Sequence, residues 1–144
     1  MTNWLLDAEV LLALVWPRHE GHRAAHAWFA ETGKSGWASN TLTQIGALRL
    51  LTHPAVSKGV VSPADAVRIL DAMMAHPAHE FWPLEEMPLK IWGDVLSRIQ
   101  GRRDWADARL LFEAERRDGG VVTFDAGMKK LAGERLRDRV VVLG

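Results

Sequence analysis

The sequence predicts a single α/β domain built on a parallel β-sheet of about five strands flanked by α-helices. Short apolar runs alternate with longer segments of helical periodicity along the whole chain. That alternation is typical of parallel strands joined by crossover helices. The 144 residues suffice for one hydrophobic core, and 48% hydrophobic with 25% charged residues is an ordinary globular balance. No linker, repeat or low-complexity tract interrupts the chain, so we expect one domain over residues 1–144.

The predicted strands are short and apolar. They are expected at residues 4–6, 37–39, 79–83, 121–124 and 140–143. The first and fourth each end at an aspartate that precedes a predicted helix, which is the arrangement of a strand feeding a crossover helix.

The predicted helices fill the gaps between these strands. After the first strand, one helix runs to about Trp16 before Pro17, and a second covers 20–32. Thr41 begins the next, with Gln44 three residues on in capping-box spacing, and His53-Pro54 ends it. Ser62-Pro63 supplies a cap and a first-turn proline for another helix. Further helices are expected over 88–99, from Asp104 or Trp105 to Arg117, and over 126–132.

Charge and composition exclude several classes of protein. Lys plus Arg and Asp plus Glu are equal at 18 each, so any nucleic-acid partner requires a local basic patch. The absence of cysteine excludes disulfides, Cys-based zinc sites and thiol nucleophiles, and is compatible with the cytoplasm. The apolar run at residues 4–16 contains two acids, lacks a basic leader and is too short to span a bilayer. We therefore expect a cytoplasmic protein with no membrane partner.

Two aspartates stand at the carboxyl ends of predicted strands. Asp7 follows the strand at 4–6, and Asp125 follows the strand at 121–124. In open α/β sheets ligands bind outside the carboxyl ends of the strands, so both side chains point toward the expected site. The alternative interpretation is that each aspartate is only the N-cap of the next helix.

Asp107 is the third candidate, and it lies within a predicted helix. The residues three, four and seven positions further on form an apolar stripe of Leu110, Leu111 and Ala114. The polar side of the same helix is formed by Arg109, Glu113, Arg116 and Arg117. A carboxylate in line with the core face is costly unless a cation or hydrogen bonds compensate it. We interpret Asp107 as a functional acid; the alternative is a first-turn acid favoured by the helix dipole and paired with Arg103.

Weaker candidates surround these three acids. Asp104 is either a fourth acid or the N-cap of its helix, and Glu9 is either a ligand or a solvated first-turn acid. Thr123 and Asn40 are candidates to orient a ligand or a water molecule. Among several basic clusters, Lys129 and Lys130 follow Asp125 by one turn and are the first candidates to contact phosphates.

Three converging carboxylates suit Mg²⁺ or Mn²⁺, because these hard cations prefer oxygen ligands and retain bound water. Such an ion activates water and stabilises charge on a scissile phosphate. Asp7, Asp107 and Asp125 together therefore predict metal-dependent phosphodiester hydrolysis.

Several stretches, taken together and in order, resemble one known family. They are Leu5-Leu6-Asp7-Ala8-Glu9-Val10-Leu11-Leu12-Ala13-Leu14, Trp28-Phe29, Arg49-Leu50-Leu51-Thr52-His53-Pro54, Asp107-Ala108 and Val122-Thr123-Phe124-Asp125. The chain resembles PIN-domain ribonucleases over nearly its whole length, and in particular the VapC toxins of VapBC toxin–antitoxin pairs. The resemblance implies a five-stranded parallel sheet, a homodimer, a Mg²⁺- or Mn²⁺-dependent endoribonuclease, and a VapB-like antitoxin whose C-terminal segment covers the acidic pocket. Asp7, Asp107 and Asp125 fall on three of the family's acidic positions.

The chain departs from the family's pattern at two positions. Glu9 stands where the family usually has Asn or a similar polar residue, and Gly46 stands where many members carry a glutamate. One hypothesis is that Glu9 supplies the missing charge. Two further interpretations stay open: a PIN-fold binding module with weak or no catalysis, and a PIN nuclease of RNA processing without an antitoxin.

A group of histidines looks like a metal motif. His19-Glu20-Gly21-His22 and His26 lack the spacing of a zincin, in which the two histidines stand four apart and glutamate follows the first. Weak Zn²⁺ binding by the three imidazoles is one interpretation. The interpretation that we adopt is a polar helix flank.

Overall fold

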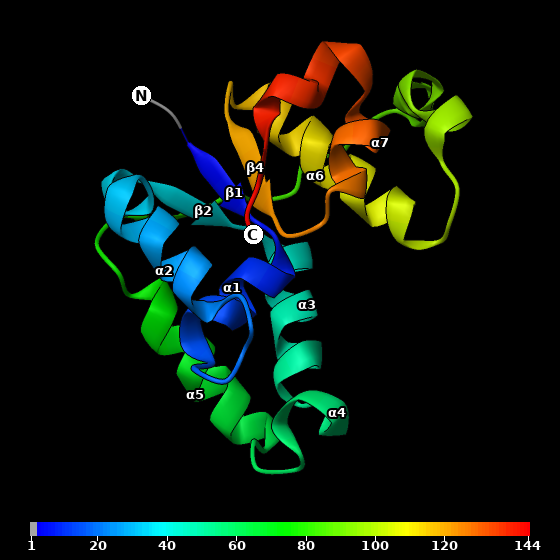
Figure 1. Ribbon diagram of the computed structural model, residues 1–144. Coiled ribbons are helices and arrows are strands. Elements are labelled where there is room, and N and C mark those ends of the chain that lie inside the picture. The colour runs from blue at the N-terminus through cyan, green and yellow to red at the C-terminus, as the bar shows by residue number, and fades with distance from the viewer. Residues whose placement is uncertain (1–2) are drawn as a thin grey trace.

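The computed structural model, which describes residues 3–144, contains a five-stranded sheet in which every pairing is parallel. The strand order is β3-β2-β1-β4-β5 (Figure 1). The strands are β1 (Trp4–Leu6), β2 (Trp37–Ser39), β3 (His79–Phe81), β4 (Gly120–Thr123) and β5 (Val140–Val142). The predicted α/β class is confirmed. β3 is two residues shorter than predicted, β4 begins and ends one residue earlier, and β5 ends one residue earlier.

The helices pack on both sides of this sheet. They are α1 (Ala8–Val15), α2 (His22–Glu31), α3 (Thr41–Leu51), α4 (Pro54–Ser57), α5 (Pro63–Met74), α6 (Arg103–Arg116) and α7 (Gly127–Leu136). Short 3₁₀ helices are η1 (Gly33–Ser35), η2 (Leu89–Asp94), η3 (Leu96–Arg98) and η4 (Arg137–Arg139). In Figure 1, α1, α2, α3 and α5 lie on one side of the sheet, and α6 and α7 lie on the other.

Two hydrophobic cores follow from the alternation of side chains along the strands. Leu5 and Val121 face α6 and α7, where Phe112 and Leu131 belong to the same buried cluster. Leu6 and Val122, one residue further on, belong to the opposite cluster with residues of α1, α3 and α5. The central strands are therefore buried on both faces, as expected for a parallel sheet.

Local capping explains where several helices begin. Asp7 is the N-cap of α1, and Ser62 caps α5 with Pro63 in its first turn, as predicted. The predicted capping box of Thr41 and Gln44 is wrong. The N-cap of α3 is instead Asn40, which is fully buried. Its side-chain oxygen accepts from the Thr43 N–H at 3.0 Å, and its own N–H donates to the Thr43 hydroxyl at 3.0 Å.

The predicted α-helix at 88–99 is also wrong. This segment forms η2 and η3, with Pro88 before the first and Gly93 inside it. The Arg98 backbone N–H donates a hydrogen bond to the Val95 carbonyl, and the Arg98 guanidinium donates one to the Asp94 carbonyl at 2.7 Å. An α-helix would need that carbonyl for the Arg98 N–H, so the side-chain bond favours the 3₁₀ form.

Two further differences concern the helices. Pro54 does not simply end α3, because a four-residue helix, α4, begins there. Glu113, expected on the polar side of its helix, is 1% exposed and is paired with Arg109 at 2.8 Å. Burial of a charged residue requires such a partner. No helix within residues 3–144 is long and apolar enough to cross a membrane.

Candidate functional site

The carboxyl ends of β1, β2 and β4 bring the predicted polar residues to one edge of the sheet. β1 pairs with β4 through Leu6 and Val122, so Asp7 and Thr123 come next to each other. On the other side β1 pairs with β2 through Leu5 and Ala38, so Asn40 occupies the corresponding place beside Asp7. Parallel strands end together, and this shared edge is where α/β folds bind ligands.

Asp7, Thr123 and Asp125 are connected by hydrogen bonds. The Thr123 hydroxyl donates to Asp7 Oδ2 at 2.8 Å, and the Asp125 backbone N–H donates to the Thr123 hydroxyl at 3.0 Å. Asp7 Oδ1 accepts from the Ala8 N–H at 2.8 Å, and Asp125 Oδ1 accepts from the Gly127 N–H at 2.8 Å. Asp7 is therefore the N-cap of α1, as the alternative interpretation expected. Asp125 is not the N-cap of α7, which is Ala126, although Asp125 bonds to the first residue of that helix. One hydrogen-bond network fixes both aspartates at the edge of the sheet.

Burial and neighbouring charges act on Asp7. Burial raises the pKa of Asp7 above its ordinary value, and the negative charges of Asp125 and Glu9 act in the same direction. The hydrogen bonds from Thr123 and the Ala8 N–H lower that pKa, because they stabilise the charged form.

The pKa of Asp107 is raised far above its ordinary value. Burial raises the pKa of Asp107 to about 7, and the charges of Asp7, Asp125 and Asp104 add to the effect, whereas Arg103 opposes it. The alternative pairing with Arg103 is wrong, because no ion pair within residues 3–144 joins the two. Asp107 therefore lies near the other acids without an ion pair among residues 3–144, although the charge of Arg103 acts on it.

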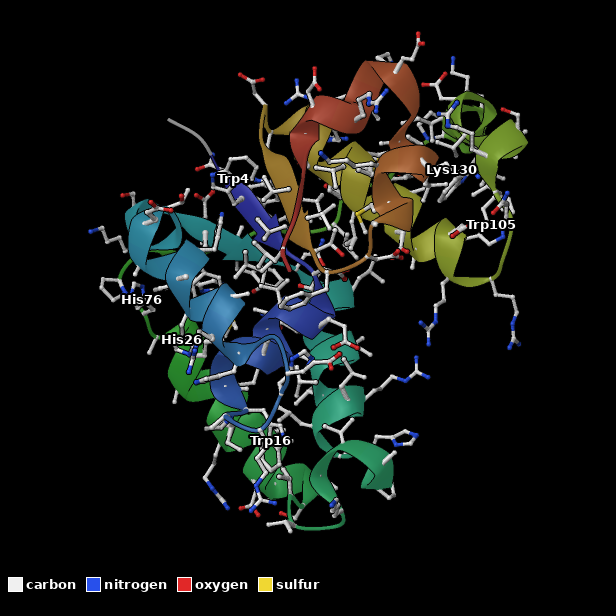
Figure 2. All side chains as sticks on the ribbon, viewed as in Figure 1. Trp4, Trp16, His26, His76, Trp105 and Lys130 are labelled. Atoms are coloured by element: carbon white, nitrogen blue, oxygen red, sulfur yellow. The ribbon has the colours of Figure 1, made fainter. Side chains whose placement is uncertain are left out.

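A cavity of about 230 Å³ opens beside these acids, between the start of α6 and the start of α7. Its lining residues are Arg98, Gln100, Asp104, Asp107, Asp125, Gly127, Met128, Lys130 and Leu131. Figure 2 shows Lys130 on α7, near the end of α6 that carries Trp105. The cavity brings three of the predicted acids together with one of the two predicted lysines.

Asp104 lines the cavity but is not the N-cap of its helix. α6 begins at Arg103, so Asp104 lies in the first turn. Its Oδ2 accepts from the N–H groups of Gln100 and Gly101 at 2.7 and 3.2 Å. These bonds hold the preceding loop at the rim of the cavity, a role that the sequence did not indicate.

Of the basic candidates, Lys130 lines the cavity and Lys129 does not. Arg98, from one of the basic clusters, also lines it, but its guanidinium is engaged with α7. It donates to the Leu131 carbonyl at 2.8 Å and to the Ala132 carbonyl at 3.5 Å, next to the bend at Gly133. Arg98 is therefore bound within the fold, and Lys130 is the predicted lysine that lines the acidic cavity.

Asn40 carries an unused donor. Its side-chain oxygen accepts from Thr43, but its amide nitrogen is buried and has no hydrogen-bond partner within residues 3–144. Buried polar groups normally have partners, so a lone buried donor at a ligand-binding edge is a candidate to orient a bound group.

Glu9 and Gly46 lie close to the acids on the other side of Asp7. The Glu9 carboxylate accepts a hydrogen bond from His19 Nε2 at 2.9 Å. A side chain at Gly46 would bring its Cβ to 2.6 Å from the Ala8 Cβ. The packing of α3 against α1 therefore leaves no room for a side chain at position 46 unless the two helices shift.

The acids fit a divalent cation by their chemistry. Among residues 3–144, no three His, Asp or Glu side chains are grouped closely enough to hold a metal ion as they stand. Asp7, Asp107 and Asp125 nevertheless offer only oxygen donors, and after burial the charges of Asp7 and Asp125 contribute to the raised pKa of Asp107. Oxygen donors with uncompensated negative charge are what Mg²⁺ and Mn²⁺ require.

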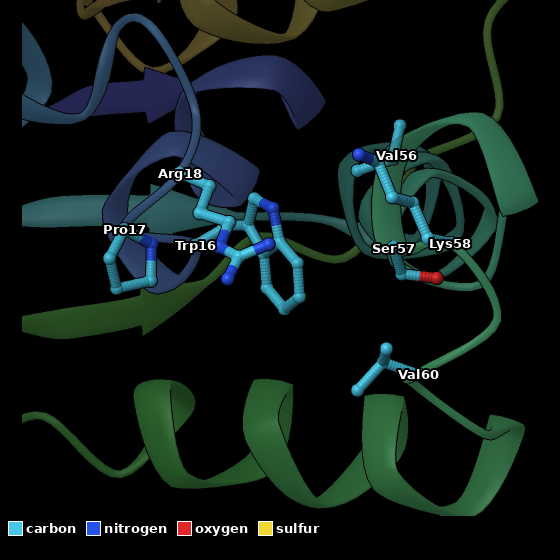
Figure 3. A pocket seen from close by; sticks show the side chains of 7 residues that line it. All are labelled: Trp16, Pro17, Arg18, Val56, Ser57, Lys58 and Val60. Atoms are coloured by element: carbon cyan, nitrogen blue, oxygen red, sulfur yellow. The ribbon is translucent and has the colours of Figure 1, made fainter.

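A larger cavity lies elsewhere. It measures about 520 Å³ and is lined by Trp16, Pro17, Arg18, Val56, Ser57, Lys58 and Val60 (Figure 3). This cavity is at the end of α1 opposite to Asp7, about 12 Å away along the helix, and no acid lines it. Its size does not make it the reactive site, because it holds none of the predicted groups.

The fold, the strand order and the acids at the sheet edge define an α/β protein of the PIN type. A comparison with protein families agrees, because the PIN domain matches residues 4–134. The chain therefore belongs to the PIN-domain family.

Its relatives place it among the VapC-type members of that family. Ribonuclease VapC39 of Mycobacterium tuberculosis is 37% identical over 134 residues, which are 92% of this chain and 95% of that protein. Ribonuclease VapC38 of the same organism is 37% identical over 139 residues, 96% of each chain. Ribonuclease VapC44 is 36% identical over 121 residues, 84% of each chain.

Proposed function

We propose that this protein is a Mg²⁺- or Mn²⁺-dependent endoribonuclease and the toxin of a type II toxin–antitoxin pair. The observation that supports the proposal is the link between Asp7 and Asp125 through Thr123, together with Asp107, whose pKa the charges of both aspartates raise. The names of the relatives, each a VapC ribonuclease, support the choice of RNA as substrate.

Each residue has a distinct proposed part. Asp7, Asp107 and Asp125 hold the ion, with Glu9 and Asp104 at the periphery. When bound, the ion would activate water for attack and stabilise negative charge on the scissile phosphate. Thr123 keeps Asp7 and Asp125 aligned through its two hydrogen bonds, and the free amide of Asn40 orients a bound group. Lys130, and less directly Lys129, attract the RNA backbone.

The proposed partners follow from the VapC likeness. A VapB-like antitoxin would neutralise the protein by covering the acidic pocket with its C-terminal segment, and the toxin itself would be a homodimer. We propose that it acts in the cytoplasm, because that is where the RNA of a bacterial cell is. An antitoxin gene beside this one would separate a toxin from a PIN nuclease of RNA processing.

The test is cleavage of RNA by purified protein with Mg²⁺ or Mn²⁺, compared with EDTA and with Asp125→Asn. Asparagine keeps the size and much of the capping ability of aspartate but removes the charge. Asp118→Asn is the matched control, because Asp118 has a 95% exposed side chain and φ of 52°, which asparagine tolerates.

We expect cleavage to be lost with EDTA and in Asp125→Asn, and to be unchanged in Asp118→Asn. Cleavage that survives Asp125→Asn would contradict the proposal. Absence of both cleavage and metal binding in the intact protein would favour the binding-module alternative, for which the missing acid at Gly46 is the supporting observation.

A further inference from the structure

The three histidines of the 19–26 segment each have a specific partner. His22 Nδ1 donates to the Ala13 carbonyl at 2.7 Å, and His26 Nε2 donates to the Leu14 carbonyl at 2.8 Å. Figure 2 shows His26 on α2. Both rings thus satisfy carbonyls in the last turn of α1, which have no partner within the helix. His19 differs, because its Nε2 meets the carboxylate of Glu9 at 2.9 Å.

The proton of the neutral His19 ring is placed by its second contact. The Gly21 backbone N–H donates to His19 Nδ1 at 2.9 Å, so Nδ1 is an acceptor. A neutral imidazole then carries its hydrogen on Nε2, the atom that faces Glu9. His19 therefore donates to Glu9 without needing a positive charge.

His19 is held firmly against the acidic site. Its side chain is 16% exposed, and its ring packs on Phe124 with centroids 5.6 Å apart and planes inclined by 32°. The backbone of Gly21 also contacts the Phe124 ring so closely that a Cβ at position 21 would collide with it. Phe124 directly precedes Asp125. The loop that carries His19 therefore packs against the end of β4, next to Asp125.

Glu9 is an acid close to Asp7 that remains outside the hydrogen-bond network of Asp7, Thr123 and Asp125. It lies in the first turn of α1, two residues after Asp7, and its charge contributes to the raised pKa of Asp7. Its side chain is 49% exposed, and His19 supplies its only hydrogen bond among residues 3–144. An exposed glutamate without a partner would sample many rotamers. The bond to His19 restricts the Glu9 side chain to rotamers that keep this contact.

We propose that His19 is a positioning residue, which holds the Glu9 carboxylate beside Asp7 so that Glu9 serves as the outer acid of the cation site. A side chain at position 46 would collide with the Ala8 Cβ, whereas Glu9 supplies a carboxylate from the first turn of α1. The inference rests on the proposed metal-dependent function and adds a residue that the acids alone do not indicate. Partners in the outer shell of a metal site commonly set its affinity.

The test measures Mn²⁺ binding to metal-free protein by electron paramagnetic resonance, without RNA. The key pair of variants is His19→Asn and His19→Gln. Asparagine retains an acceptor near the position of Nδ1 but does not reach Glu9, whereas the amide of glutamine reaches the position of Nε2. We expect His19→Asn and Glu9→Gln each to weaken Mn²⁺ binding by roughly 10-fold, and His19→Gln to stay close to the intact protein.

A double variant, His19→Asn with Glu9→Gln, tests whether the two residues affect Mn²⁺ binding together or separately. If His19 acts through Glu9, His19→Asn adds little to the loss that Glu9→Gln already causes. His26→Asn is the matched control, because that ring also bonds to α1 but touches no acid. We expect it to leave Mn²⁺ binding unchanged, and thermal melting of every variant separates weaker binding from loss of fold.

Three results would overturn the inference. Unchanged Mn²⁺ affinity in Glu9→Gln, a variant at an exposed position, would show that Glu9 is no part of the site. Tighter binding in His19→Asn would show that His19 holds Glu9 away from the ion. Equal losses in His19→Asn and His19→Gln would indicate a role in loop packing alone. If the intact protein bound no Mn²⁺, the proposed function itself would fail, which is a different result.

Discussion

The Thr123 hydroxyl donates a 2.8 Å hydrogen bond to Asp7 Oδ2 and joins the ends of two neighbouring strands. The two residues are 116 positions apart in the chain. The same hydroxyl accepts from the Asp125 N–H, so one buried oxygen sets the relative positions of two of the three acids. The side chain of Thr123 is fully buried, and neither bond can be replaced by bulk water.

Thr123→Val should therefore damage both the fold and the site. Valine keeps the shape of threonine but leaves Asp7 Oδ2 and the Asp125 N–H without their partner. We expect a loss of about 1–3 kcal/mol of unfolding free energy and a roughly 10-fold loss of Mn²⁺ affinity, measured by urea denaturation and metal titration. Thr123→Ser retains the hydroxyl and is the control. Mn²⁺ affinity equal in the valine and serine variants would show that the hydroxyl does not organise the acids.

The stability of the metal-free protein should fall as the pH rises toward 7. The pKa of Asp107 is about 7 in the folded protein and 3.8 in the unfolded chain, so between these values only the folded state holds the proton. Stability contributed by this group is complete at low pH and is lost as the pH approaches 7. Asp107→Asn removes the effect. We expect the variant to be more stable than the intact protein at pH 8 by at least about 1 kcal/mol, with a smaller difference at pH 5.5.

Thermal melting in EDTA at several pH values checks this expectation. Mg²⁺ added at pH 8 should raise the melting temperature of the intact protein and have no such effect on Asp107→Asn. An equal difference between the two proteins at pH 5.5 and pH 8 would mean that Asp107 does not titrate in this range.

Gly46→Ala should destabilise the protein, although alanine normally favours a helix. The new Cβ would approach the Ala8 Cβ to 2.6 Å and push the start of α1, which Asp7 caps. Overpacking of this kind costs about 1–3 kcal/mol, to be measured by chemical denaturation. Ala8→Gly in the same chain should recover part of the loss, because it removes the opposing atom. Gly101→Ala is the control, since no atom lies within 4 Å of its Cβ position. A stabilising effect of Gly46→Ala would show that the two helices separate easily.

The two neighbouring lysines should differ in their effect on RNA binding. Lys130 lines the acidic cavity and Lys129 does not, although both are exposed. Lys130→Ala should weaken binding of a short single-stranded RNA to the catalytically disabled Asp125→Asn protein. The slope of the logarithm of the binding constant against the logarithm of the salt concentration should fall by the equivalent of about one phosphate contact. Lys129→Ala is the matched comparison and should have a smaller effect. Fluorescence anisotropy at several salt concentrations measures both, and equal losses would place the RNA outside this cavity.

The fold was predictable, and so was the placement of the candidate acids near the sheet edge, because their signals are local. Each of Asp7 and Asp125 directly follows a short apolar strand, and a parallel sheet brings such strand ends together. The apolar stripe after Asp107 likewise indicates an inward-facing acid. These inferences need only the periodicity of strands and helices.

What the sequence did not indicate depends on contacts between distant segments. Glu113 looked polar in its helix, but its burial depends on how α6 packs. Arg98 looked like a free cation until the bend at Gly133 exposed the α7 carbonyls that it binds. The role proposed for His19 depends on its contacts with Phe124 and Gly21. Nothing in the spacing of the histidines predicts those contacts.

The most direct test of the account is the position of Mn²⁺ in crystals of this protein, found by anomalous scattering. The account predicts a peak at the carboxyl edge of the sheet, with oxygens of Asp7, Asp107 and Asp125 at about 2 Å or bridged to it by water, and no such peak in crystals of Asp125→Asn. A peak at another site, or none at this edge at saturating Mn²⁺, would contradict the central claim that these three aspartates form a metal centre.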